Sequence, residues 1–245
     1  MERSWQERFD IMKKRVPEFV AKKGFKEWFF ANKKNGWLFD TILVQRCFNI
    51  HNDISIKKDK DHFMLIIGGE GLGKSTLGLQ ICSWIDPEFT KKNVCFTPKD
   101  YIRQLKTAKK GSCLLIDEGG VSLYSRESMG KMNIKLTKLF MLQRQKNICC
   151  VVVCPSFYDI DAYIRRHRIN TMIRIFKQGH YMGMLRKCID IINDVGYRRK
   201  PLTHIKLPSG FFWHGYFVKG FPKTIERKAY IEKKRKHLEK FINDL

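Results

Sequence analysis

The sequence lacks any apolar run long enough to cross a bilayer. Its longest such run, Ile148–Pro155, is far shorter than the roughly 20 residues that a membrane-spanning helix needs. The first ten residues, MERSWQERFD, carry acids where a secretory signal needs an apolar stretch. No internal repeat or low-complexity segment is visible. We therefore expect a soluble protein in the cytoplasm.

The sequence also lacks any C-x-x-C pair, although it contains eight cysteines. Zinc sites commonly use closely paired cysteines, so this absence argues against a zinc-binding module. Several of the cysteines fall inside predicted buried strands, where a reduced thiol acts as a small apolar side chain. Free buried thiols indicate a reducing compartment.

Acidic residues are scarce relative to basic ones. Lys and Arg number 48 against 24 Asp and Glu, which gives a net charge of +24 and a pI near 9.8. Such an excess favours a polyanionic partner, namely DNA, RNA or an anionic membrane surface. A lysine-rich proteome would spread the charge evenly, whereas here it gathers in runs such as Arg165–Arg168 and Lys233–Lys236. For each run, a solvated face is the alternative.

What the sequence does contain is a phosphate-binding loop. The stretch HFMLIIGGEGLGKST reads as a buried strand over His62–Ile67, a glycine-rich turn, and a helix that begins near Lys74. Backbone N–H groups in such a turn surround a phosphate chain, the lysine contacts the β and γ phosphates, and the serine hydroxyl binds Mg²⁺. The expected nucleotide-binding residues are Gly68, Gly69, Glu70, Gly71, Leu72, Gly73, Lys74, Ser75 and Thr76.

A second acidic element follows about forty residues later. The apolar strand Cys113–Ile116 ends in Asp117 and Glu118. An acid at the carboxyl end of a strand beside the P-loop strand can complete the Mg²⁺ shell, and the next acid can polarise an attacking water. An acidic turn is the alternative. We predict Ser75 and Asp117 as metal residues and Glu118 as the catalytic acid.

The order of elements predicts an α/β fold with a parallel sheet between helices. The expected helices are residues 98–109, for which Thr97 is the N-cap, Glu127–Lys146 and Tyr158–Arg168. The expected strands, besides the two above, are Val94–Phe96, Ile148–Cys154 and Thr171–Phe176.

We expect two further segments around this core, which itself spans residues 61–178. Residues 1–60 form a basic, aromatic-rich helical lead-in, with helices near Trp5–Val16 and Trp37–Phe48. Its aromatic residues pack on the core, and a platform for bases is the alternative. Residues 179–245 form a basic β/α extension, with strands over Tyr181–Ile192 and Ile205–Val218 and a final helix over Lys223–Leu245.

Three stretches, GGEGLGKST, LLIDE and Leu142–Phe176, resemble the additional-strand, catalytic-glutamate branch of P-loop ATPases. Within it, the chain is most similar to the FtsK/HerA group of DNA-pumping motors, with viral genome-packaging ATPases and Zot-like phage proteins in close company. The resemblance covers residues 60–178 and implies a RecA-like sheet. These families place an arginine before the strand that corresponds to Ile148–Cys154, and a polar residue after that strand. Here the polar residue is Ser156, where such motors often carry Gln.

The resemblance implies an ATP- and Mg²⁺-dependent DNA translocase acting as a homo-oligomeric ring, plausibly the packaging motor of a virus or mobile element. A capsid or portal component is then a possible partner, and the location is the host cytoplasm or the virion. Three alternatives stay open. They are a helicase or helicase loader, a Zot-like assembly or secretion ATPase at a membrane surface, and a nucleotide-dependent binding protein.

One arginine is predicted to act across a subunit boundary. Arg144, just before the Ile148–Cys154 strand, is expected to reach the γ-phosphate held by a neighbouring subunit. An arginine that stabilises a helix C-terminus is the alternative. Arg126 is the rival candidate, and Arg165 and Arg166 are more remote ones.

Overall fold

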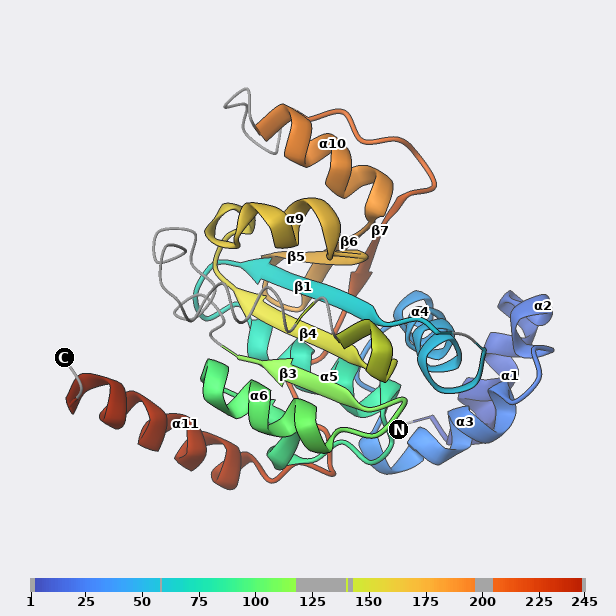
Figure 1. The fold of residues 1–245 in the computed structure, drawn as a ribbon. Coiled ribbons are helices and arrows are strands. Elements are labelled where there is room, and N and C mark those ends of the chain that lie inside the picture. Colours follow the sequence, from blue (N-terminus) through green and yellow to red (C-terminus); the bar gives the residue numbers. More distant parts are fainter. Residues whose placement is uncertain (1–2, 58, 118–139, 141–142, 197–204, 244–245) are drawn as a thin grey trace.

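The fold is built around one continuous sheet. The computed structural model describes residues 3–57, 59–117, 140, 143–196 and 205–243. Within them, seven strands pair in the order β2-β3-β4-β1-β5-β6-β7 (Figure 1). Their bounds are β1 His62–Gly68, β2 Val94–Cys95, β3 Cys113–Ile116, β4 Cys149–Cys154, β5 Thr171–Lys177, β6 His180–Leu185 and β7 Phe212–Tyr216. The first five strands of this order are parallel, which confirms the predicted α/β fold.

One neighbour relation differs from the prediction. The strand that leads to Asp117, β3, does not lie beside the P-loop strand, because β4 is inserted between them. Cys149 of β4 is in register with His62 of β1 on one side and with Cys113 of β3 on the other. The runs CLLI and CCVVVC are buried throughout. Such uninterrupted apolar runs suit central strands but do not determine their order.

Each face of the sheet carries its own apolar core. Met64 and Ile66 of β1 pack with helix α5, Lys74–Ile85, and with the N-terminal helices. Phe63, Leu65 and Ile67 point to the other core, which helices α6, α9 and α10 cover. These helices span Pro98–Thr107, Ala162–His167 and Arg186–Gly196. Alternate residues of one strand thus serve both layers, as the two-residue side-chain period requires.

The N-terminal segment is helical and supplies an aromatic cluster. It contains α1 Trp5–Arg15, α2 Pro17–Val20, α3 Phe25–Ala31, η1 Asn32–Asn35, α4 Thr41–Asn52 and η2 Asp53–Lys57. The helix expected over Trp37–Phe48 starts only at Thr41, because Asp40 caps it by accepting from the N–H groups of Ile42 and Leu43. Phe25, Trp28 and Phe29 are buried, so they are packing residues.

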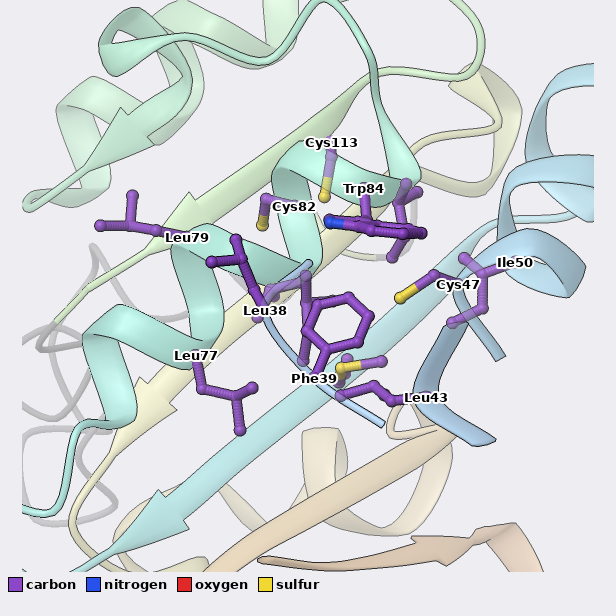
Figure 2. Close-up of a cluster of buried hydrophobic side chains, with 14 of the residues drawn as sticks. Leu38, Phe39, Leu43, Cys47, Ile50, Leu77, Leu79, Cys82, Trp84 and Cys113 are labelled. Atoms are coloured by element: carbon purple, nitrogen blue, oxygen red, sulfur yellow. The ribbon is translucent and has the colours of Figure 1, made fainter. Parts of the chain in front are cut away.

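Trp84 of α5 connects this cluster to the sheet. Its ring centroid lies 5.1 Å from that of Phe39 and 5.5 Å from that of Trp28. Figure 2 shows Phe39 and Trp84 among the buried side chains of α4 and α5, together with Cys47 and Cys82. All eight cysteines are free and buried, as predicted for small apolar side chains.

The C-terminal segment continues the sheet, but one of the two strands predicted there is partly a helix. The strand expected over Tyr181–Ile192 ends at Leu185, because β6 spans His180–Leu185 and Arg186–Gly196 is helix α10. Cys188, Ile189 and Ile192 of α10 are buried at helical spacing, so the strand predicted here is wrong beyond Leu185. The last helix, α11, spans Arg227–Asn243.

Hydrogen bonds join the two ends of the chain. Tyr181 on β6 donates its hydroxyl to Asp40 Oδ2 at 2.7 Å, and the Tyr216 N–H donates to the same oxygen at 3.0 Å. The side-chain amide of Gln80 on α5 donates to the carbonyls of Val218 and Gly220. The C-terminal strands are therefore fixed against the helix that carries the P-loop lysine. Across the described ranges, no helix combines the length and apolarity needed to span a membrane.

Candidate nucleotide-binding site

The P-loop joins β1 to α5 at the carboxyl edge of the sheet, and its glycines meet two different demands. Gly73 has φ 97°, in the left-handed region that favours glycine, and a Cβ there would lie 3.2 Å from the Phe217 ring. At Gly68, a Cβ would lie 2.6 Å from the carbonyl oxygen of Ile175. The loop thus requires glycine for its backbone shape and for close approach to β5.

Lys74 is the first residue of α5 and lies at its positive end. Its ammonium donates to the Gly69 carbonyl oxygen at 2.8 Å, so the side chain folds back over the loop. Burial is the largest effect on the pKa of Lys74 and lowers it from its ordinary value, while the nearby Glu70 and Asp117 carboxylates oppose that shift. This places a cation and the N-terminus of a helix at the same end of the loop, as phosphate binding requires.

Asp117 follows β3 directly and is fully buried. Its backbone N–H donates to the Cys95 carbonyl at 3.0 Å, which fixes the residue beside β2. Ser75 donates its hydroxyl to Asp117 Oδ1 at 2.7 Å. The structure therefore brings together the two residues that we predicted to bind metal, although β4 separates their strands.

The residues present fit Mg²⁺ and a nucleotide phosphate chain. A serine hydroxyl and a carboxylate are hard oxygen ligands of the kind that Mg²⁺ uses. Four of the six loop residues from Gly68 to Gly73 are glycines, which carry no side chain, and the Lys74 ammonium supplies the opposite charge. Ser75 and Asp117 would hold the metal, and the loop with Lys74 would hold the phosphates.

Two side chains that sequence analysis did not single out also contact Asp117. The Tyr230 hydroxyl donates to Asp117 Oδ2, and the Lys234 ammonium lies 3.7 Å from the same oxygen. Both residues come from α11, more than a hundred positions along the chain. Their helical spacing of four was visible in the sequence, but nothing local tied that face to Asp117. Lys234 was instead assigned to a DNA-binding run.

Ser156, the predicted polar residue after β4, lies next to the P-loop. The carbonyl of the preceding residue, Pro155, accepts from the N–H of Gly68 at 3.2 Å. The Ser156 hydroxyl caps the short helix η6, Phe157–Asp159, by accepting from the N–H of Tyr158 at 3.4 Å. The hydroxyl thus has a local structural partner, and its role toward a phosphate stays a prediction.

Arg144 lies at the amino ends of the parallel strands, opposite the ends that carry the P-loop. It begins the short helix η5, Arg144–Lys146, which leads into the amino end of β4, and it is exposed. Because β4 runs parallel to β1, this position is remote from the P-loop of its own subunit. A contact with a γ-phosphate would have to be made across a subunit boundary. Glu118, Arg126 and most of the predicted helix Glu127–Lys146 lie outside the described residues.

The two basic runs divide into buried and exposed parts. Arg168 pairs with Asp61 in a largely buried ion pair, and Arg165 lies over the rings of Phe157 and Tyr158. Lys233 and Lys234 face the protein, whereas the side chains of Arg235 and Lys236 are 71% and 68% exposed. Only part of each run is available to a polyanion.

Comparison with known proteins finds its matches among solved structures. The chain is similar to the N-terminal domain of zonular occludens toxin from Neisseria meningitidis, at 16% identity and a TM-score of 0.39, over 70% of this chain and 97% of that one. It is also similar to the genome packaging NTPase B204 of Sulfolobus turreted icosahedral virus 2 in complex with AMPPCP. That match has 9% identity and a TM-score of 0.38, over 53% of this chain and 94% of that one.

Both structures are of kinds that the sequence resemblance named, a Zot protein and a viral packaging NTPase. At these TM-scores neither likeness adds to the fold, which the strand order and the P-loop already define. No protein-family model matches the sequence, and no curated protein matches it.

Proposed function

We propose that the protein is an ATP-hydrolysing DNA translocase that works as a homo-oligomeric ring, plausibly to package the genome of a virus or mobile element. The observation that carries the ATPase part is the 2.7 Å hydrogen bond between Ser75 and Asp117 beside a glycine-shaped loop. This pairing assembles phosphate-binding and metal-binding groups at one point. If Asp117 were only part of an acidic turn after β3, it would not need to contact the serine of the P-loop.

Each residue has a distinct task in this proposal. Lys74 binds the terminal phosphates, Ser75 and Asp117 hold Mg²⁺, and Glu118 orients the attacking water. Bound Mg²⁺ would neutralise phosphate charge and polarise the bond that breaks. Burial of Asp117 keeps bulk water away from the carboxylate, which strengthens its interactions with cations.

The net charge of +24 supports DNA as the partner. The exposed basic side chains of Arg235 and Lys236 lie on α11, the long helix that Figure 1 shows at the lower left of the molecule. Binding of this kind neutralises phosphates without contacting base edges, so we propose that it is independent of sequence.

DNA affinity should therefore fall steeply with salt. A plot of log affinity against log salt concentration has a slope of about −0.9 for each phosphate neutralised. Replacing Arg235 and Lys236 together by Gln should make this slope shallower by about 1 to 2. Lys13→Gln with Lys14→Gln is the matched control, because it removes equal exposed charge from α1. Fluorescence anisotropy on duplexes of two unrelated sequences measures both effects.

The same titration with vesicles rich in phosphatidylserine tests the membrane alternative. We expect tighter binding to DNA than to vesicles at physiological salt, with equal affinity for both duplexes. Preference for one duplex, a flat salt dependence, or binding to vesicles alone would count against DNA translocation.

A further inference from the structure

Helix α11 is anchored beside the candidate nucleotide site by contacts that do not involve Asp117. Lys233 donates to the carbonyls of Lys91 and Val94, at the start of β2. The Phe96 ring lies 6.0 Å from that of Tyr230 and is stacked on His237 at 5.7 Å. These contacts fix the middle of the helix against β2. The face that carries Tyr230 is therefore held at the carboxyl edge of the sheet whether or not Asp117 binds a cation.

Tyr230 and Lys234 lie one turn apart on that face and meet the same carboxylate oxygen. Tyr230 is 4% exposed and donates its hydroxyl to Asp117 Oδ2. The Lys234 ammonium lies 3.7 Å from Oδ2, and its side chain is 27% exposed. At 3.7 Å this contact with Asp117 is an ion pair, longer than an N–H···O hydrogen bond.

The structure therefore places two ammonium groups around one phosphate-binding loop. Lys74 approaches from the start of α5, and Lys234 approaches from α11. Asp117 already pairs with Lys234, and the second ammonium attracts a further anion to the site. The terminal phosphates of a nucleoside triphosphate are such an anion.

We propose that Lys234 is a phosphate-binding residue, which contacts the terminal phosphate of the nucleoside triphosphate held by its own subunit. The inference rests on the proposed nucleotide-hydrolysing function and extends it to the C-terminal helix. When a divalent cation neutralises Asp117, it also repels the Lys234 ammonium. Because α11 is anchored on β2, the ammonium stays at the site, and its flexible four-carbon stem lets it turn to the phosphate oxygens. Tyr230 keeps its hydrogen bond to Asp117 and positions the carboxylate.

The competing possibility is that Lys234 only neutralises Asp117 in the nucleotide-free protein. The two possibilities predict opposite effects of removing the charge. If Lys234 binds phosphate, removing its charge weakens the binding of the triphosphate. If Lys234 is only a counter-ion that competes with Mg²⁺ for Asp117, removing its charge strengthens the binding of the Mg²⁺-nucleotide.

The test is isothermal titration calorimetry of Mg²⁺-ATPγS and Mg²⁺-ADP on the full chain. Lys234→Met should lower the affinity for ATPγS by about 10- to 100-fold, the worth of one charged hydrogen bond. Its affinity for ADP should change by less than about threefold, because ADP lacks the third phosphate. Lys234→Arg keeps the charge and should retain most ATPγS affinity. Lys228→Met is the matched control, since Lys228 lies on the same helix and is exposed.

Thermal unfolding of each nucleotide-free variant separates binding from folding. If Lys234→Met unfolds early, Lys234→Gln, which also removes the charge but keeps a polar side chain, takes its place in the same titrations. Unchanged or increased ATPγS affinity, or equal loss for both nucleotides, would overturn the inference. If the wild-type protein binds neither nucleotide, the proposed function fails as well. If it binds both and Lys234→Met behaves as wild type, only this inference fails.

Discussion

Replacement of Glu118 by Gln should leave ATP binding intact and reduce turnover by about 10²- to 10⁴-fold. The carboxylate at this position is expected to orient and polarise the attacking water, and the amide of Gln cannot accept a proton from it. Nucleotide binding depends instead on the loop and on Lys74, which the substitution leaves in place. Single-turnover hydrolysis and nucleotide titration on the same sample measure the two quantities separately.

Lys74→Ala is the matched comparison for this experiment. Its ammonium lies over the P-loop, where it donates to the Gly69 carbonyl at 2.8 Å, so its loss should weaken nucleotide affinity itself. The two variants should thus fail in different ways, one in turnover and one in binding. Hydrolysis by Glu118→Gln at the wild-type rate would show that another residue is the catalytic acid.

Arg144→Ala should abolish DNA-stimulated hydrolysis while leaving nucleotide binding to isolated subunits unchanged. Phosphoryl transfer spreads negative charge over the γ-phosphate oxygens, and a guanidinium supplied there is worth about 10³-fold or more in rate. Arg144 precedes the amino end of β4 and is remote from the P-loop of its own subunit, so the predicted contact requires a neighbouring subunit. Subunits would then associate head to tail, the arrangement that closes into rings.

Mixing two inactive variants tests this arrangement. Arg144→Ala supplies an intact Glu118, and Glu118→Gln supplies an intact Arg144. Mixed rings should therefore regain part of the wild-type activity, because some interfaces combine both intact residues. Arg103→Ala is the control, as Arg103 is also exposed at the surface and pairs with Asp100 three residues earlier. Full activity of Arg144→Ala alone, or no recovery in rings shown to be mixed, would assign the role elsewhere, with Arg126 as the next residue to replace.

Much of the parallel core could be predicted because each element carried its own local signal. The bounds of β3, Cys113–Ile116, agree with the prediction, since four apolar residues lie between a glycine-serine turn and an acid. Helix α6 starts where Thr97 and Pro98 indicated, with the Thr97 hydroxyl accepting from the N–H of Asp100 at 3.0 Å. Caps and buried strands are decided by neighbouring residues, so a single sequence contains them.

What could not be predicted depends on partners distant in the sequence. The insertion of β4 between β1 and β3 is a matter of strand order, and no residue in either strand encodes it locally. Helix α10 is an exception, because the spacing of its buried residues Cys188, Ile189 and Ile192 is a local helical signal that the prediction of a strand overlooks. The contacts of Tyr230 and Lys234 with Asp117 span more than a hundred positions, and the basic run around Lys234 looked like a solvent-facing surface.

The most direct test of the central claim is the ATPase rate of the wild-type protein with and without double-stranded DNA, on a sample whose oligomeric mass has been measured. A translocase should hydrolyse ATP slowly alone and several times faster with DNA, and the stimulation should appear in the oligomeric fraction and disappear in Glu118→Gln. A rate that does not respond to DNA in a sample shown to be oligomeric and to bind DNA would contradict the account. Nucleotide binding without turnover under the same conditions would identify a switch, and stimulation by anionic vesicles alone would identify an assembly ATPase.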